Sequence, residues 1–255
     1  MDTISVEQIV YAPVPYKGYS VRAKSKAANI DSFKSAFREW LIPFDQSVIL
    51  RGFQEKVIVL GKKNLYLARV FQAQGLDEKK RSGVVSHIAE IPMDLFLQGK
   101  ILLSSVYSSM AEFTERNGVP IGEIPPLEIP FGFENDAELN SIREVFSEAN
   151  TRKVLEQVAN DKFKLFIINR SYDANMLSYG LARIISLAVS KWIIIAPDFI
   201  KTDILFLYDG SLIIGKTLPP WARVKGWSII NLEKEGSATM GGSEVIDSVM
   251  KKIYG

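Results

Sequence analysis

The sequence contains no cysteine and a single histidine, His87. Without cysteine the chain can form no disulfide, no thiolate nucleophile and no cysteine-ligated zinc or iron–sulfur site. A metal site would have to use aspartate and glutamate, with or without His87, and no spacing of these residues along the chain suggests one. We therefore expect neither a metal nor a cofactor.

Long uncharged hydrophobic runs are also missing. The most apolar stretch, 181–196, is interrupted by Arg183 and Lys191 and falls short of the roughly 18 uncharged residues that a membrane-spanning helix needs. The N-terminus carries Asp2 and Glu7 and has no basic segment followed by an apolar run, so it does not read as a secretory signal. These absences predict a cytoplasmic protein without a membrane span.

Neither sign of charge is in excess, because 31 basic and 29 acidic residues give a net charge of +2. No overall field therefore draws the protein toward nucleic acid or an anionic membrane, and any such binding must rest on a local patch. With 255 residues, of which 47% are hydrophobic, the chain can bury a sizeable core as one large domain or two small ones.

The N-terminal half shows regular periodicity. Apolar and polar residues alternate, or apolar residues run together, in stretches that predict strands over 4–11, 19–25, 56–61, 64–72 and 83–91. A helix capped by Asn29 or Asp31 is expected to run to about Trp40, and further helices are expected over 93–97 and 103–117. The resulting order is β-β-α-β-β-β-α, so we expect an α+β fold with a five-stranded antiparallel sheet.

Residues 119–135 are rich in proline and glycine, and include Pro120, Pro125, Pro126 and Pro130. Proline interrupts both helices and internal strands, so this segment is not expected to hold a regular element. We predict a linker here, between a first domain at 1–118 and a second domain at 136–255.

The second domain is predicted to be a smaller α/β part. Helical periodicity covers 136–158, 175–190 and 243–252, an apolar run predicts a strand over 163–168, and shorter runs lie at 192–196 and 226–232. Asp209-Gly210, between the apolar runs 204–208 and 212–214, is typical of a two-residue hairpin turn.

The segment from Gly210 to Thr217 satisfies the P-loop pattern of two spaced glycines followed by Lys-Thr. A P-loop opens directly into a helix whose first amides hold phosphate, whereas two prolines follow closely here. We therefore favour a strand within this segment. A nucleotide hydrolase built on Lys216 is kept as a hypothesis.

His87 is the one candidate general base of its type. Neighbouring residues of a strand point to opposite faces of the sheet, so Ser86 and His87 cannot form a catalytic pair through adjacency. We favour a hydrogen-bonded sheet residue at this position. Because no other catalytic constellation is recognisable, we predict that the protein is not an enzyme.

Two segments combine features of nucleic-acid contacts. One interleaves aromatic and basic side chains, as single-strand binding platforms do, and the other is a basic run in a polar link between strands. Their residues are Trp221, Arg223, Lys225 and Trp227, and Lys79, Lys80 and Arg81. For both we favour the simpler interpretation, namely a loop packed on a core for the first and a solvated loop for the second.

The N-terminal residues resemble a known family. Gln8 to Tyr11, then Gly18-Tyr19, then Ala23 and Ser25 are similar to the opening of the N-terminal domain of prokaryotic GTPase-associated proteins, and 81–88 resembles a later segment of that domain. This resemblance covers roughly residues 4–95 and implies a role for His87. Independently, the order of strands and helices is that of a longin-like domain, and such domains commonly act as platforms for small GTPases.

These features predict a non-enzymatic protein-interaction or regulatory module, longin-like in its N-terminal part, with a small GTPase as the candidate protein partner. The predicted contact residues are Tyr11, Gly18, Tyr19, Arg81 and His87. The alternative is a nucleic-acid-binding protein that uses the basic and aromatic residues named above. Its binding would fall steeply with salt, because bound counterions are released.

Overall fold

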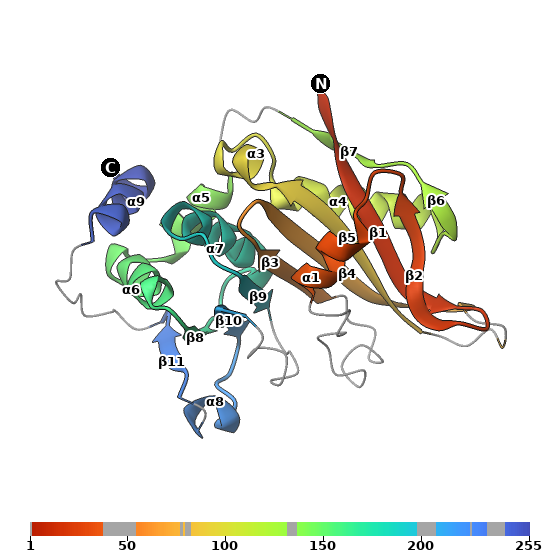
Figure 1. Cartoon of the computed structure of the whole chain (residues 1–255). Helices are drawn as coiled ribbons and strands as arrows, with labels where there is room; N and C mark the ends of the chain where they lie inside the picture. Colours follow the sequence, from red (N-terminus) through yellow and green to blue (C-terminus); the bar gives the residue numbers. More distant parts are fainter. Residues whose placement is uncertain are drawn as a thin grey trace. The chain divides into compact units, whose positions relative to one another are not determined.

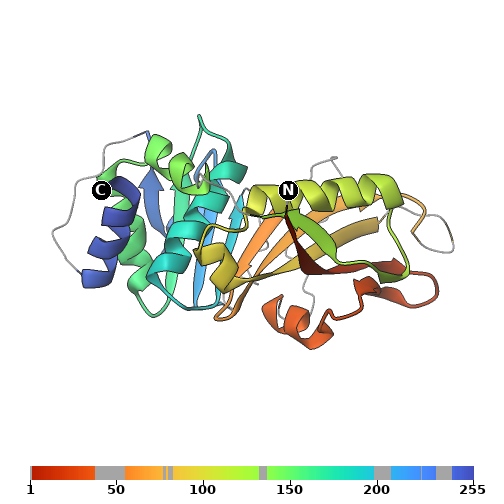
Figure 2. The same ribbon diagram turned by 90° about the horizontal axis from the view of Figure 1, so that it is seen from above.

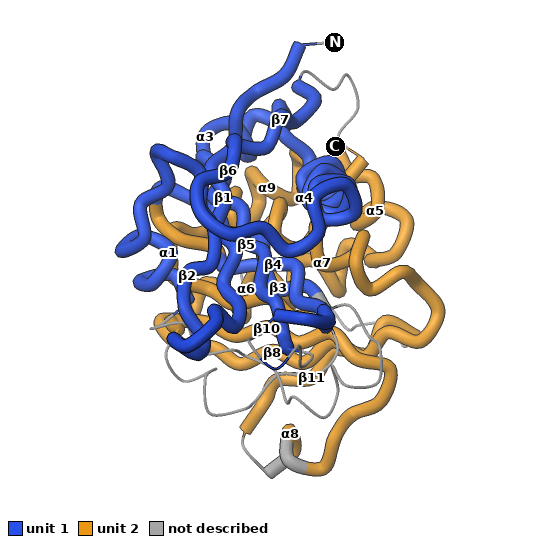
Figure 3. Tube along the Cα trace, turned by 90° about the vertical axis from the view of Figure 1, so that its right-hand side faces the viewer, with its two compact units in different colours: residues 1–59, 63–133 blue, residues 60–62, 134–255 orange. Residues whose placement is uncertain are grey.

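The chain forms two compact units in the computed structural model. The structure describes residues 2–37, 55–76, 79, 83–131, 137–197, 208–224, 226–233 and 243–255. Unit 1 comprises residues 1–59 and 63–133, and unit 2 comprises 60–62 and 134–255 (Figure 3). Helices and strands both contribute to the fold, as expected for the α+β class.

Unit 1 is built on a mainly antiparallel sheet (Figure 1). Its strands are β1 (Thr3–Val14), β2 (Gly18–Ser25), β3 (Glu55–Leu60), β4 (Asn64–Ala73), β5 (Gly83–Pro92), β6 (Gly122–Ile124) and β7 (Leu127–Pro130). The order within the unit is β3-β4-β5-β1-β2-β6, and β7 pairs with the start of β1. The long strand β1 is antiparallel to β2, β5 and β7, so it holds the unit together.

Helices cover both faces of this sheet, as Figure 2 shows for α1 (Ile30–Ala36) and α4 (Leu103–Asn117). A short helix, α3 (Met93–Leu97), connects β5 to α4. Alternate residues of each strand face opposite sides. The ring of Phe33 in α1 lies 5.5 Å from that of Tyr66 on one face, while Phe113 of α4 packs against an apolar cluster on the other.

The first helix begins where the sequence predicts it. The side chain of Asn29 accepts hydrogen bonds from the backbone N–H groups of Asp31 and Ser32, which identifies Asn29 rather than Asp31 as the cap. The helix ends at Ala36, earlier than the predicted Trp40, and Trp40 itself lies outside the described residues.

The expectation that residues 119–135 hold no regular element is wrong. β6 and β7 form there. The proline pair at 125–126 lies between the two strands and Pro130 is the last residue of β7, so these prolines do not interrupt the backbone hydrogen bonds within either strand. The side-chain amide of Gln8 also donates to the carbonyl oxygen of Pro125 at 2.6 Å. This segment therefore belongs to unit 1, and the chain divides between 133 and 134.

The described residues of unit 2 include four strands that pair in parallel with one another. Its strands are β8 (Phe163–Ile168), β9 (Ile193–Pro197), β10 (Gly210–Gly215) and β11 (Ser228–Asn231), in the order β11-β8-β10-β9. Its helices are α5 (Ala137–Val145), α6 (Glu148–Ala159), α7 (Ala174–Ala188), α8 (Pro220–Val224) and α9 (Glu244–Tyr254). Helix α6 packs on β8 and β11, and α7 packs on β9 and β10. Among the described residues, no helix has the length and apolar character needed to cross a membrane.

The hairpin predicted at Asp209-Gly210 is wrong, because β10 pairs in parallel with β8 on one side and with β9 on the other. Residues 204–207 of the predicted partner strand lie outside the described residues. The Asp-Gly pair instead starts a buried strand. The Asp209 carboxylate accepts from the backbone N–H of Trp192 at 3.0 Å, and Gly210 leaves room for the ring of Phe163, which a Cβ would meet at 2.0 Å.

Candidate functional site

Two of the predicted contact residues, Tyr11 and Tyr19, meet on the β1–β2 hairpin. Their ring centroids are 6.0 Å apart, and the hydroxyl of Tyr11 donates to the carbonyl oxygen of Tyr19 at 3.4 Å. The hydroxyl of Tyr19 accepts from the backbone N–H of Val84 at 3.0 Å, which fixes its ring while 36% of the residue stays exposed. Burial and the neighbouring Tyr19 raise the pKa of Tyr11, so its hydroxyl is neutral at physiological pH.

The hairpin turn presents a third tyrosine that the sequence reasoning missed. Tyr16 is 89% exposed and has a φ of +62°, a left-handed conformation that costs a non-glycine residue roughly 1–3 kcal/mol. Gly18 has a φ of +73°, a backbone conformation that suits glycine. Gly18 therefore contributes to the turn through its backbone and not through a side-chain contact. An aromatic residue at the centre of a Pro-Tyr-Lys-Gly turn was the available sequence signal.

A β-bulge at Arg22 anchors the hairpin, because Val10 pairs with Ala23 whereas Tyr11 pairs with Val21. The buried guanidinium of Arg22 donates to the carbonyl oxygens of Pro13 and Leu76, at 2.5 and 2.8 Å. Among the described residues, the outer edge of β2 pairs with β6 only over 23–25, so 18–22 form an edge without a strand partner. We call Tyr11, Tyr16, Gly18 and Tyr19, with this edge, the hairpin surface.

His87 lies on the opposite face of the sheet from the hairpin tyrosines, since Val10 pairs with His87 and Tyr11 with Ser86. The residue is 1% exposed; its Nε2 lies 2.5 Å from Oε1 of Gln8 and its Nδ1 lies 3.3 Å from Oγ1 of Thr114. Burial, followed by the charge of Arg69, lowers the pKa of His87 to about 3. The imidazole is therefore a neutral, hydrogen-bonded sheet residue, and its prediction as a contact residue is wrong.

The predicted nucleic-acid residues are divided between the two units. Lys79 is exposed in unit 1, whereas Lys80 and Arg81 lie outside the described residues. In unit 2 Arg223 is exposed in α8; Lys225 and the side chain of Trp221 lie outside the described residues. Trp227 is only 7% exposed, so it packs into the core of unit 2 and cannot offer its face to a base.

The P-loop hypothesis does not fit the structure of its own segment. Residues Gly210–Gly215 form the buried strand β10, not a loop, and α8 begins only at Pro220 and is five residues long. Both glycines have a packing role. A Cβ at Gly215 would lie 2.8 Å from the ring of Phe166, and a Cβ at Gly210 would clash with the ring of Phe163. Lys216 is exposed after the strand.

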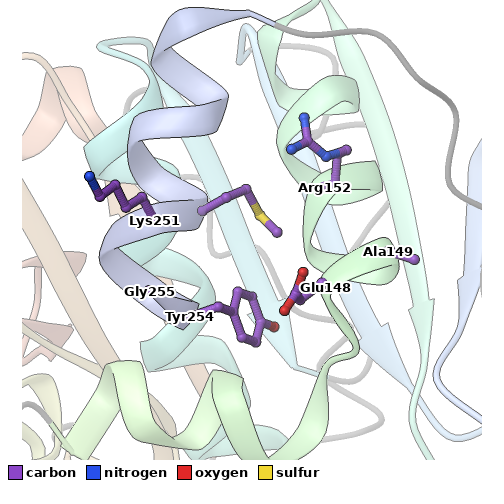
Figure 4. Close-up of a pocket in the computed structure, with 7 residues that line it drawn as sticks. Glu148, Ala149, Arg152, Lys251, Tyr254 and Gly255 are labelled. Carbon is purple, nitrogen blue, oxygen red and sulfur yellow. The ribbon is translucent and has the colours of Figure 1, made fainter.

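A groove of about 510 Å³ runs between α6 and α9 in unit 2 (Figure 4). Figure 4 shows Tyr254 of α9 pointing toward Glu148 of α6. The hydroxyl of Tyr254 interacts with Oγ1 of Thr151 at 2.7 Å and donates to the carbonyl oxygen of Phe146 at 2.9 Å, while Arg152 pairs with Asp247 at 2.8 Å. These polar groups join the two helices, so the groove has a structural explanation.

A second cleft of about 730 Å³ lies where the strands of unit 2 end. We call it the carboxyl-edge cleft; it is lined by Ile168, Arg170, Thr217, Leu218, Arg223, Ile229, Asn231 and Glu233. Of these residues the sequence reasoning singled out Arg223 and Thr217, but not Arg170. No three acidic or histidine side chains within the described ranges lie close enough together to hold a metal ion.

Neither the protein-family models nor the curated proteins supply a relative of this chain. No protein-family model matches this sequence, and no curated protein matches it either. The two candidate sites are therefore the hairpin surface of unit 1 and the carboxyl-edge cleft of unit 2.

Proposed function

We propose that this protein is a cytoplasmic, non-enzymatic interaction or regulatory module that binds a protein partner through the hairpin surface of unit 1. The observation that carries the proposal is the exposed ring of Tyr16, held in a left-handed conformation at the tip of a hairpin. Backbone strain of this kind persists where the surrounding structure or a function maintains it.

The chemistry of the hairpin surface suits a protein partner. Tyrosine combines a large apolar ring with a polar hydroxyl and few rotatable bonds, which is why it is enriched at the centres of interfaces. Within the described residues the edge of β2 at 18–22 has no strand partner, so its backbone offers donors and acceptors to an added strand. Aromatic anchors beside such an edge favour an extended peptide segment of the partner.

The arrangement of unit 1 supports a longin-like domain. Along the chain, α1 follows β2, and α3 and α4 follow β5, which is the order expected of that fold. Together with the resemblance of the N-terminal residues to GTPase-associated proteins, this makes a small GTPase the proposed partner. The link from fold to partner is an analogy, so the partner itself must be tested directly.

Affinity capture with matched variants tests the proposal. The wild-type protein, Tyr16→Asn and Tyr172→Asn serve as baits in lysate with and without nuclease treatment, with GDP or a non-hydrolysable GTP analogue added. Asparagine tolerates positive φ, so Tyr16→Asn keeps the turn while it removes the ring. Tyr172 is 48% exposed in unit 2 and provides the control.

We expect a GTP-binding protein to be recovered by the wild type and by Tyr172→Asn, with recovery by Tyr16→Asn reduced about tenfold or more, as for an interface anchor. Equal recovery by all three baits would reject the hairpin surface. Loss of every partner on nuclease treatment would favour the nucleic-acid alternative.

A further inference from the structure

The carboxyl-edge cleft is formed by the residues that follow three parallel strands. Arg170 comes two residues after β8, Thr217 two residues after β10, and Glu233 two residues after β11. Because parallel strands end at the same edge of the sheet, these residues meet there although they are far apart in sequence. Hydrogen bonds confirm the closeness, since Nε of Arg170 donates to the carbonyl oxygen of Lys216 at 3.4 Å.

The edge at which these strands end is also where open parallel sheets bind ligands. In such sheets the ligand lies in a crevice outside the carboxyl ends of the strands. The cleft has a volume of about 730 Å³, which lies within the range of small-molecule sites.

The lining carries more positive than negative charge. Two guanidinium groups, those of Arg170 and Arg223, face a single carboxylate, that of Glu233. Arg170 is held loosely, since its Nη1 lies 3.5 Å from the Glu233 carboxylate and its side chain is 61% exposed. No acidic side chain within the described part of the chain forms an ion pair with Arg223. Two such cations are suited to phosphate, which arginine binds through paired hydrogen bonds.

The remaining residues of the cleft provide neutral hydrogen-bonding groups and an apolar surface. Thr217 contributes a hydroxyl, and Oδ1 of Asn231 accepts from the backbone N–H of Glu233 at 3.1 Å, so the amide nitrogen of Asn231 is a further donor. Ile168, Leu218 and Ile229 add apolar surface, and Ile229 is 40% exposed although it lies in a strand. An apolar ring of a ligand would cover this surface.

We infer that the carboxyl-edge cleft binds a phosphorylated small molecule of nucleotide size, with Arg170 and Arg223 at the phosphate and Ile229 against the ring. This site differs from a P-loop, because its phosphate contacts come from side chains of separate elements. A nucleic-acid strand is disfavoured, since Trp227 is buried and gives no face for stacking. The inference is independent of the partner proposed for unit 1.

Ligand binding to the purified protein tests this inference. The probes are ATP, GTP, pyrophosphate, unphosphorylated adenosine and a single-stranded oligonucleotide. Binding of each probe is measured by calorimetry and by the shift in the melting temperature of the protein. The variants are Arg170→Ala and Arg223→Ala, and the control is Lys251→Ala, which removes one exposed positive charge beside the α6–α9 groove.

We expect saturable binding of a nucleotide, weaker binding of pyrophosphate and none of adenosine. Each arginine variant should lose about tenfold or more in affinity, whereas Lys251→Ala should bind as the wild type does. Unchanged melting temperatures without ligand would show that the variants fold. The inference is overturned if no phosphorylated probe binds, if Lys251→Ala loses as much as the arginine variants, or if only the oligonucleotide binds.

Discussion

At the scale of single residues, the only histidine of the chain makes stability depend on pH. Burial and Arg69 lower the pKa of His87 to about 3, whereas an unfolded histidine titrates near about 6.5. Between these values the unfolded chain binds more protons than the folded one, so stability rises with pH and is lost as the pH falls. This group contributes a slope of up to ~1.4 kcal/mol per pH unit in that window.

Denaturant unfolding of the wild type and of His87→Gln at a series of pH values measures this effect. Carboxylates contribute equally to both proteins, so we expect the wild type to lose stability relative to the variant as the pH falls below about 6.5. A difference that does not change with pH would contradict the prediction. The NMR signal of the single imidazole is the control. Its chemical shift must remain that of a neutral imidazole at every pH at which the protein stays folded.

At the scale of elements, the close approach of α5 and α7 depends on Gly180. A Cβ at this position would lie 2.6 Å from the carbonyl oxygen of Glu138 and 2.7 Å from Cγ1 of Ile142. Alanine favours a helix over glycine by about 1 kcal/mol, but overpacking in a core costs about 1–3 kcal/mol. We expect Gly180→Ala to destabilise unit 2 by about 1 kcal/mol, measured by denaturant unfolding.

Ser186→Ala, in the same helix, is the matched control. Within the described part of the chain the buried Oγ of Ser186 has no hydrogen-bond partner, so its removal should not lower the stability. If Gly180→Ala raised the stability instead, the two helices would be free to separate, and helix propensity rather than packing would dominate at this position.

Most elements were predictable because their signals are local. Leu103, Val106 and Met110 recur at helical spacing and are buried along α4, and Asn29 caps α1 through bonds to residues two and three positions on. Two predictions failed at positions where residues far apart in the sequence determine the strand pairing. β7 exists because the start of β1 pairs with it, and Asp209-Gly210 starts a strand because parallel neighbours occupy both sides of β10.

At the scale of the whole molecule, the candidate sites were predictable only in part. Tyr11 and Tyr19 were found from a resemblance in sequence, and the structure brings their rings together. The role of Arg170 was not predictable, since only the strand order places it beside Thr217 and Arg223. A site assembled from the ends of separate strands leaves no motif in the sequence, whereas a hairpin surface lies within a dozen consecutive residues.

The hairpin surface and the carboxyl-edge cleft belong to different units, which makes their two proposed activities separable. Tyr16→Asn should lose partner capture and bind nucleotide as the wild type does, and Arg170→Ala should show the reverse. Sites that share no interaction partners usually respond to mutation independently. Both assays on both purified variants check this expectation. If either variant lost both activities, the two sites would be coupled, and the nucleotide would act as a regulator of partner binding rather than as a separate ligand.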